Sequence, residues 1–91
     1  MRDVESLNVN KAAKENLALY KEKVEVSELD RHDLHIIEHT KHGLTPEFER
    51  LAGKKPAVKE RLLEHIRMHK KFDSIKTEME GAAGEHLTLN V

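Results

Sequence analysis

Six of the seven histidines in this 91-residue chain fall in two short stretches, at spacings that suit a metal ion. The first stretch reads HDLHIIEHTKH and the second reads HIRMH. His35 and His39 are four residues apart, as are His65 and His69, so each pair projects from one face of a helix. Two pairs that face each other supply four nitrogens, the tetrahedral arrangement that Zn²⁺ prefers. These spacings predict a zinc site formed by the two pairs.

Side chains near the four predicted ligands are expected to support the zinc site. His32 lies three residues before His35 and is expected to replace one ligand or to support another. His42, beside Gly43, is the weakest candidate, because an imidazolium there also suits the negative end of the helix dipole. Carboxylates are expected to orient the metal-bound imidazoles, and four acidic residues next to the histidines are available for this: Asp30, Asp33, Glu38 and Glu64.

The same histidines allow two other interpretations. They can fill a small polar core in which imidazoles bond to carboxylates without any metal. They can also hold an exchangeable or reactive ion, as in a metal-dependent enzyme or a metal sensor. Catalysis is disfavoured, because the sequence lacks HExxH and ExxH motifs and a glycine-rich phosphate loop. Four protein ligands also leave no open position for a substrate, so we predict that the chain is not an enzyme.

Apolar periodicity and capping residues predict an all-α fold around these histidines. We expect an antiparallel helical hairpin with an N-terminal helix and a short connecting helix. Residues 1–9 lack helical periodicity and are expected to be extended, whereas residues 10–80 form the helical domain. Residues 81–91 are expected to be a flexible tail.

The first helix is expected to start at Lys11, with Asn10 as its cap and with VEV at 24–26 as an extended link. Its buried face is predicted from apolar residues at steps of three and four: Ala13, Leu17, Tyr20 and Val24.

The second helix is expected to carry the first histidine stretch and to end at Gly43. Ser27 with Asp30, or Asp30 alone, is its predicted cap. Its inner line is predicted to contain Leu29, His32, Ile36 and His39.

A short third helix is predicted between the two histidine-bearing helices. Thr45 caps it, Pro46 occupies its first turn, and Gly53 follows its end. Pro56 then opens the last helix, which is expected to persist to about residue 80. The apolar seam of that helix comprises Val58, Leu62, His65, His69 and Phe72, flanked by Ile66, Ile75 and Met79.

Composition narrows the possible partners. Charged residues make up 36% of the chain, yet the net charge is −1, which gives no electrostatic footprint for sequence-specific nucleic-acid binding or for an anionic membrane. No apolar run is long enough for a membrane span, and the N-terminus does not read as a signal peptide. Without cysteine and with few aromatics, a core of this size needs a metal, a partner or a larger host protein.

Beyond these patterns, the order of the motifs resembles the C-terminal region of portal proteins from tailed bacteriophages. The segments KAAKENLAL, VEVSELDRHDLHIIEH, PEFERL and LLEHIRMHKKF carry the resemblance over roughly residues 11–72. The matching positions are Ala12, Glu15, Asn16, Asp30, His32, His35, Ile36, His39, Glu47, Phe48, His65 and His69. Lys11 stands where the family usually has Gln, and a customary Gly before the hydrophobic link is missing.

The resemblance implies a structural role in the virion, where portal proteins form the ring through which DNA is packaged and ejected. This chain is too short to be a whole portal, so it is expected to be an excised terminal domain or a small protein built on that module. The implied partners are other virion or phage assembly proteins, and a homo-oligomer is also open. The implied location is the virion or the host cytoplasm.

Overall fold

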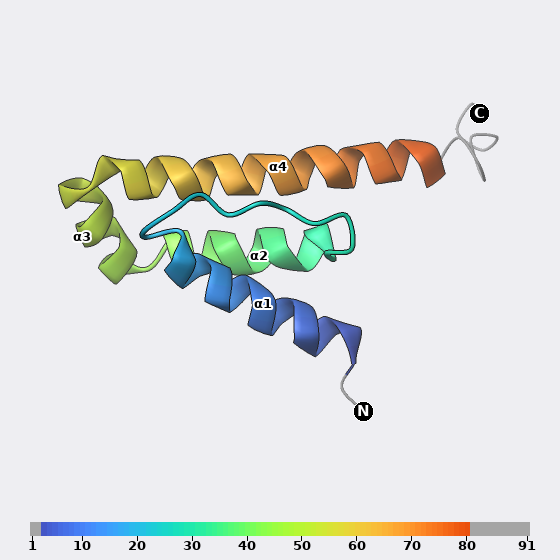
Figure 1. Ribbon diagram of the computed structural model, residues 1–91, viewed down its shortest axis with the longest axis horizontal. Helices are drawn as coiled ribbons and strands as arrows, with labels where there is room; N and C mark the ends of the chain where they lie inside the picture. The colour runs from blue at the N-terminus through green and yellow to red at the C-terminus, as the bar shows by residue number, and fades with distance from the viewer. Residues whose placement is uncertain (1–2, 81–91) are drawn as a thin grey trace.

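The computed structural model describes residues 3–80, with side chains described for residues 3–75. The described chain is all-α and consists of four helices: α1 (Val4–Ala18), α2 (His32–Gly43), α3 (Pro46–Lys54) and α4 (Pro56–Glu80). In Figure 1, α2 and α4 run antiparallel beside each other, and α3 connects them at one end. Helix α1 packs obliquely across α2. The predicted fold class, a helical hairpin with an N-terminal helix and a short connecting helix, is therefore confirmed.

Helix α1 begins seven residues earlier than the sequence pattern predicted. The side chain of Asp3 caps it by accepting a hydrogen bond of 2.7 Å from the amide of Ser6. The extended segment predicted for residues 1–9 is therefore wrong from Val4 onward, and residues 1 and 2 lie outside the described part of the chain. The helix ends at Ala18, because the chain turns there and the Arg61 guanidinium binds the carbonyls of Leu19 and Tyr20, both at 2.7 Å. If α1 continued past this point, the carbonyls of Leu19 and Tyr20 would instead accept hydrogen bonds from backbone amides of the helix.

The buried face of α1 is polar, which corrects the predicted apolar face. Within the helix the buried residues are Asn8, Ala12, Glu15 and Asn16. Leu17, predicted to be buried, is 62% exposed, and Ala13 is also exposed. Tyr20 and Val24 follow the helix and pack at the edge of the core. Periodicity alone chose the wrong side, because polar side chains on α1 have buried partners on other helices.

The predicted boundaries of α2 and α3 are largely confirmed. Helix α2 ends at Gly43, and the Thr45 hydroxyl caps α3 by accepting a 3.2 Å hydrogen bond from the Phe48 amide. Two details differ. Asp30 forms a turn with Ser27 instead of capping α2, and the N-cap residue of α2 is Arg31, whose side chain makes no capping hydrogen bond.

Helix α3 also continues one residue past Gly53, to Lys54. The glycine therefore does not end this helix, which breaks only where Pro56 opens α4.

A small apolar core occupies one end of the hairpin, between α3 and the first half of α4. Its buried members are Leu19, Phe48, Val58, Leu62 and Ile66. The seam predicted on α4 is confirmed from Val58 to His69, whereas Phe72 is half-buried and Ile75 is 44% exposed. Leu29, which was expected on the inner line of α2, precedes that helix and is 92% exposed. Met79 lies outside the residues whose side chains are described.

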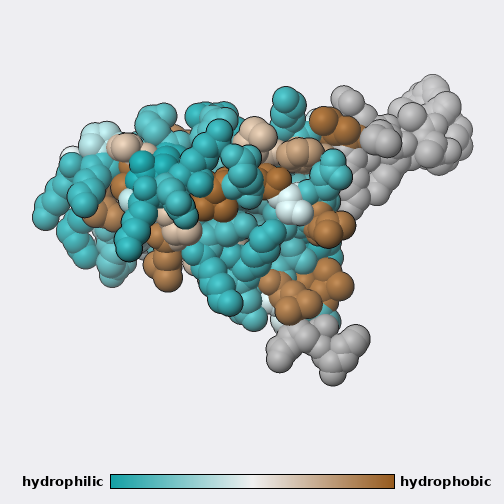
Figure 2. All heavy atoms as spheres, viewed as in Figure 1, coloured by the Kyte–Doolittle hydropathy of each residue, from teal (hydrophilic) through white to brown (hydrophobic). Residues whose placement is uncertain are grey.

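The visible surface is mostly hydrophilic, with scattered apolar side chains (Figure 2). The exposed large apolar residues come from several elements: Val4, Leu7, Val9, Leu17, Leu29, Ile37, Leu44, Leu63 and Ile75. In the part of the chain that the structure describes, no helix combines the length and the apolar character that a membrane crossing requires. The predicted tail at residues 81–91 lies outside the described residues.

Candidate metal centre

A cluster of buried titratable side chains lies where α1, α2 and α4 meet. Helix α1 supplies Glu15, α2 supplies His35 and His39, and α4 supplies His65 and His69. Glu15, His35, His39 and His69 each present one ligand atom, and these four atoms lie within 4.8 Å of one another. This cluster could hold a metal ion. Below, the five residues together are called the Glu–His cluster.

One carboxylate oxygen, Oε1 of Glu15, is the centre of the Glu–His cluster. It lies 3.3 Å from Nδ1 of His35, 3.3 Å from Nε2 of His39 and 3.1 Å from Nε2 of His65. Nε2 of His69 lies 3.2 Å from Nε2 of His65. Zinc bonds of roughly 2.0–2.1 Å imply ligand atoms about 3.3 Å apart around a tetrahedral ion. The contacts of Glu15 with His35 and His39 have this length, and all four ligand atoms lie within 4.8 Å of one another.

The outward nitrogen of His35 is fixed as a donor by Asn8. Nε2 of His35 lies 3.1 Å from Oδ1 of Asn8, which also accepts a 2.8 Å bond from the backbone amide of Arg31. The amide nitrogen of Asn8 donates to the Val4 carbonyl. Backbone groups therefore determine which atom of Asn8 is the oxygen, so Nε2 of His35 carries the proton and Nδ1 of the neutral ring is a bare lone pair.

Two other cluster histidines follow the same pattern. Nδ1 of His39 donates to Oδ1 of Asn16 at 2.7 Å, and Nδ1 of His65 donates to the Val24 carbonyl at 2.8 Å. In each neutral ring, the nitrogen that faces Glu15 is then an acceptor. Hydrogen bonds to the outer nitrogen are the usual means by which proteins orient metal-binding imidazoles.

His69 meets His32 in the same way. Their Nδ1 atoms are 2.9 Å apart, and both rings are buried. When His69 donates to His32, its Nε2 also points a lone pair into the Glu–His cluster.

The Glu–His cluster therefore contains acceptors that face acceptors. Nδ1 of His35 and Nε2 of His39 are fully buried and have no hydrogen-bond partner. A buried polar atom without a partner costs about 1–3 kcal/mol, and several lone pairs aimed at a carboxylate add electrostatic repulsion. One cation among these atoms satisfies all of them. In a metal-free polar core with these tautomers, the two nitrogens remain without a partner.

Burial and mutual contact shift the pKa values in the cluster. Burial alone would raise the pKa of Glu15, but the three imidazoles that face its carboxylate, His35, His39 and His65, outweigh burial and hold this pKa far below its usual range. Burial lowers the pKa of His69 to about 3, and the other cluster histidines add to this through charge repulsion. Burial also lowers the pKa of His39. Neutral imidazoles beside an ionised carboxylate are the protonation states that metal binding needs.

The structure brings together five of the six histidines that the sequence analysis considered: His32, His35, His39, His65 and His69. His32 does not face Glu15, and it lies behind His69, where its ring stacks on Phe72 with ring centres 5.3 Å apart. Asp30 is buried, lies 3.8 Å from Nε2 of His35 and forms an ion pair with Lys11. Both residues thus lie beside a cluster histidine, and their supporting role stays a prediction.

Three of the predicted supporting carboxylates lie elsewhere. Asp33 and Glu64 are exposed and form ion pairs with Arg31 and Arg67. Glu38 pairs with Lys41 on the same helix. Each of them directly precedes or follows a cluster histidine or His32, and one step along a helix turns a side chain by about 100°, away from its neighbour's direction.

His42, the weakest sequence candidate, is separate from the cluster. Its Nε2 lies 2.7 Å from the Tyr20 hydroxyl, and burial lowers its pKa.

Sequence reasoning missed Glu15 as a member of the site. The available signal was the polar series Asn8, Glu15 and Asn16, which recurs at helical spacing on one face of α1. Such a series on a helix with exposed leucines indicates that the polar side faces inward.

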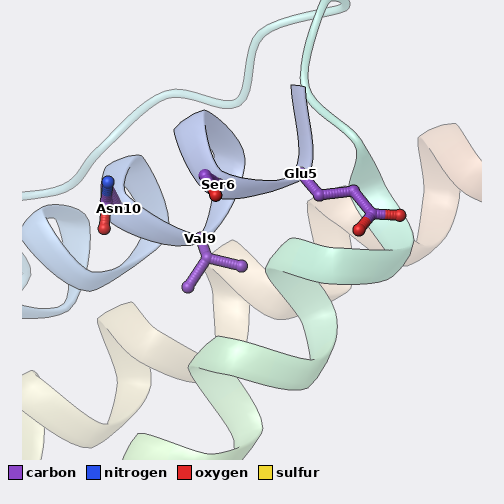
Figure 3. A pocket seen from close by; sticks show the side chains of 4 residues that line it. All are labelled: Glu5, Ser6, Val9 and Asn10. Carbon is purple, nitrogen blue, oxygen red and sulfur yellow. The ribbon is translucent and has the colours of Figure 1, made fainter. Parts of the chain in front are cut away.

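The surface near the start of α1 offers no second centre of this kind. A shallow depression there is lined by Glu5, Ser6, Val9 and Asn10 (Figure 3). No histidine lines it, and it does not reach the Glu–His cluster.

Comparison with known proteins adds no further assignment. No protein-family model, curated protein sequence or solved structure matches this chain.

Proposed function

We propose that this chain is a non-catalytic structural module in which one zinc ion binds within the Glu–His cluster and joins α1, α2 and α4. The observation that carries the proposal is that Glu15, His35, His39 and His69 present four buried ligand atoms within 4.8 Å of one another, with the outer nitrogens of His35 and His39 already bonded. Glu15, His35, His39 and His69 are the proposed ligands, with His65 next to them.

The donor set fits a borderline dication. Imidazole nitrogen suits zinc, and one carboxylate oxygen offsets half of the charge of the ion. Asp30 adds a second buried carboxylate near His35, and Lys11 offsets part of its charge. Calcium and magnesium prefer sites built from oxygen ligands, so they are poor candidates here.

Burial favours a structural role over catalysis. His35, His39 and His69 are fully buried, and His65 is 2% exposed, so a substrate reaches none of them without movement of a helix. A catalytic zinc keeps an open position for water or substrate. A small apolar core of five buried residues also gains most from a metal that binds only the folded state.

The experiment is elemental analysis of protein purified without added metal, together with melts in zinc and in chelator. We expect close to one equivalent of zinc, and a stabilisation by zinc of about 4 kcal/mol when free metal exceeds the dissociation constant a thousandfold. The variant His39→Gln should lose the metal, whereas the matched control His42→Gln should retain it. Less than about a tenth of an equivalent in the wild type, with melts unchanged by chelator, would refute the zinc site.

For the wider role we propose virion assembly or DNA packaging, which rests on the sequence resemblance to portal C-terminal regions. Mass spectrometry of purified particles, from a culture that produces this chain, tests it. Detection of the chain in stoichiometric amounts supports the role. Its absence from particles that contain the other structural proteins would refute it.

A further inference from the structure

We propose that α1 is a metal-dependent latch, which rests on the proposed zinc site: α1 docks on the α2–α4 hairpin when the ion is bound and is released when it is removed. The latch is the segment Val4–Ala18, and its pivot is the turn at Leu19 and Tyr20.

Helix α1 is attached almost entirely through polar contacts to the histidines and their surroundings. Glu15 meets His35, His39 and His65, while Asn8 and Asn16 bond to His35 and His39. The apolar contribution is small, because Ala12 is the only buried apolar residue within the helix. Hydrophobic burial therefore contributes little to holding α1 in place.

The central contact of this interface is also the one that needs a cation. Oε1 of Glu15 faces three imidazole nitrogens, two of which have no hydrogen-bond partner. Without an ion, docking of α1 brings lone pairs against a carboxylate and removes that carboxylate from water. With an ion, the same atoms become ligands. The contact between Glu15 and the histidines is therefore attractive when the metal is bound and repulsive when it is absent.

The remainder of the domain does not depend on α1 in this way. The apolar core contains Leu19, which follows α1, and otherwise residues of α3 and α4. Arg61 binds the carbonyls of Leu19 and Tyr20, which fixes the end of the latch to α4. The core and this anchor are expected to persist when α1 leaves. A released helix of 15 residues is marginal in water, so it should fray.

Hydrogen exchange of the full chain, followed by mass spectrometry with zinc and with chelator, tests the latch. Removal of zinc should accelerate exchange in peptides from α1 by about tenfold or more, while the stretch from Val58 to Ile66 on α4 changes much less. Unchanged exchange in α1 despite measured loss of zinc would overturn the latch and leave the zinc site standing. Equal acceleration in α1 and α4 would also overturn it, because the whole domain then opens. If no zinc binds, the site and the latch both fail.

Two variants in excess zinc complete the test. Glu15→Gln keeps the shape of the side chain but removes its charge, and α1 should then exchange as it does in chelator. Glu5→Gln makes the same change at an exposed position of the same helix and should behave like the wild type. Wild-type protection of α1 in Glu15→Gln would overturn the assignment of Glu15 as the contact that closes the latch.

Discussion

Stability of this domain should fall as the pH drops from 7.5 to 5, and His69 allows the size of the effect to be worked out. Burial lowers the pKa of His69 from 6.5 to about 3. The unfolded chain therefore binds a proton at this residue between those values, whereas the folded chain does not. Stability from His69 is complete above pH 6.5 and is lost as the pH falls towards 3.

The loss at pH 5 follows from the two pKa values. At pH 5 the unfolded imidazole is almost fully protonated and the folded one is almost fully neutral, which lowers the free energy of unfolding by about 2 kcal/mol relative to pH 7.5. His39 has a lowered pKa as well and adds loss in the same direction. Glu15 contributes little in this range, because its carboxyl pKa lies below pH 5 both in the unfolded chain, where it has the ordinary value of 4.5, and in the folded chain, where it is lower still.

The assay is urea unfolding followed by far-UV circular dichroism, at both pH values and in the presence of chelator so that metal release does not contribute. His69 is packed against His32, His35 and His39 of α2, so it should remain buried without metal. His69→Leu should show a shallower pH dependence than the wild type. In zinc the loss should be larger, because protons then compete with the metal. Equal wild-type stability at pH 7.5 and pH 5 in chelator would refute the burial argument.

Three substitutions, one of them with a matched control, test the core, the cap and the hydrogen bond near the site, each measured by thermal or urea unfolding. Leu62→Ala should lower the free energy of unfolding by about 2–5 kcal/mol, because it leaves a cavity in the core. The control Leu63→Ala, at a partly exposed neighbour, should lower it far less. Equal losses for the two variants would contradict the described core. Thr45→Ala should cost about 1 kcal/mol through loss of the cap of α3. Tyr20→Phe should cost about 1 kcal/mol by leaving His42 without its hydroxyl partner, and no loss would show that this bond contributes nothing.

The hairpin was predictable from local signals. Gly43 marks the end of α2, and Thr45 with Pro46 marks the start of α3. The spacing of Val58, Leu62 and the second histidine pair defines the buried side of α4. These signals act within a few residues of the chain, so they hold whatever the rest of the protein does.

The N-terminal helix was predicted wrongly for a physical reason. Apolar periodicity identifies a buried face only when the partner surface is apolar. Here the partner is a group of histidines, so Glu15 and Asn16 face inward and Leu17 faces solvent. The start of the helix was also wrong, because the sequence analysis took Asn10 as the cap whereas the cap is Asp3.

The sequence by itself determined the two histidine pairs, the helices that carry them and the antiparallel hairpin that brings them together, because helical spacing fixes which side chains share a face. Only the tertiary structure decided that Glu15 completes the cluster and that Asp33, Glu38 and Glu64 do not support it. A carboxylate on a separate helix becomes a neighbour of His39 only through the angle at which α1 crosses α2, and no pattern along the chain encodes that angle.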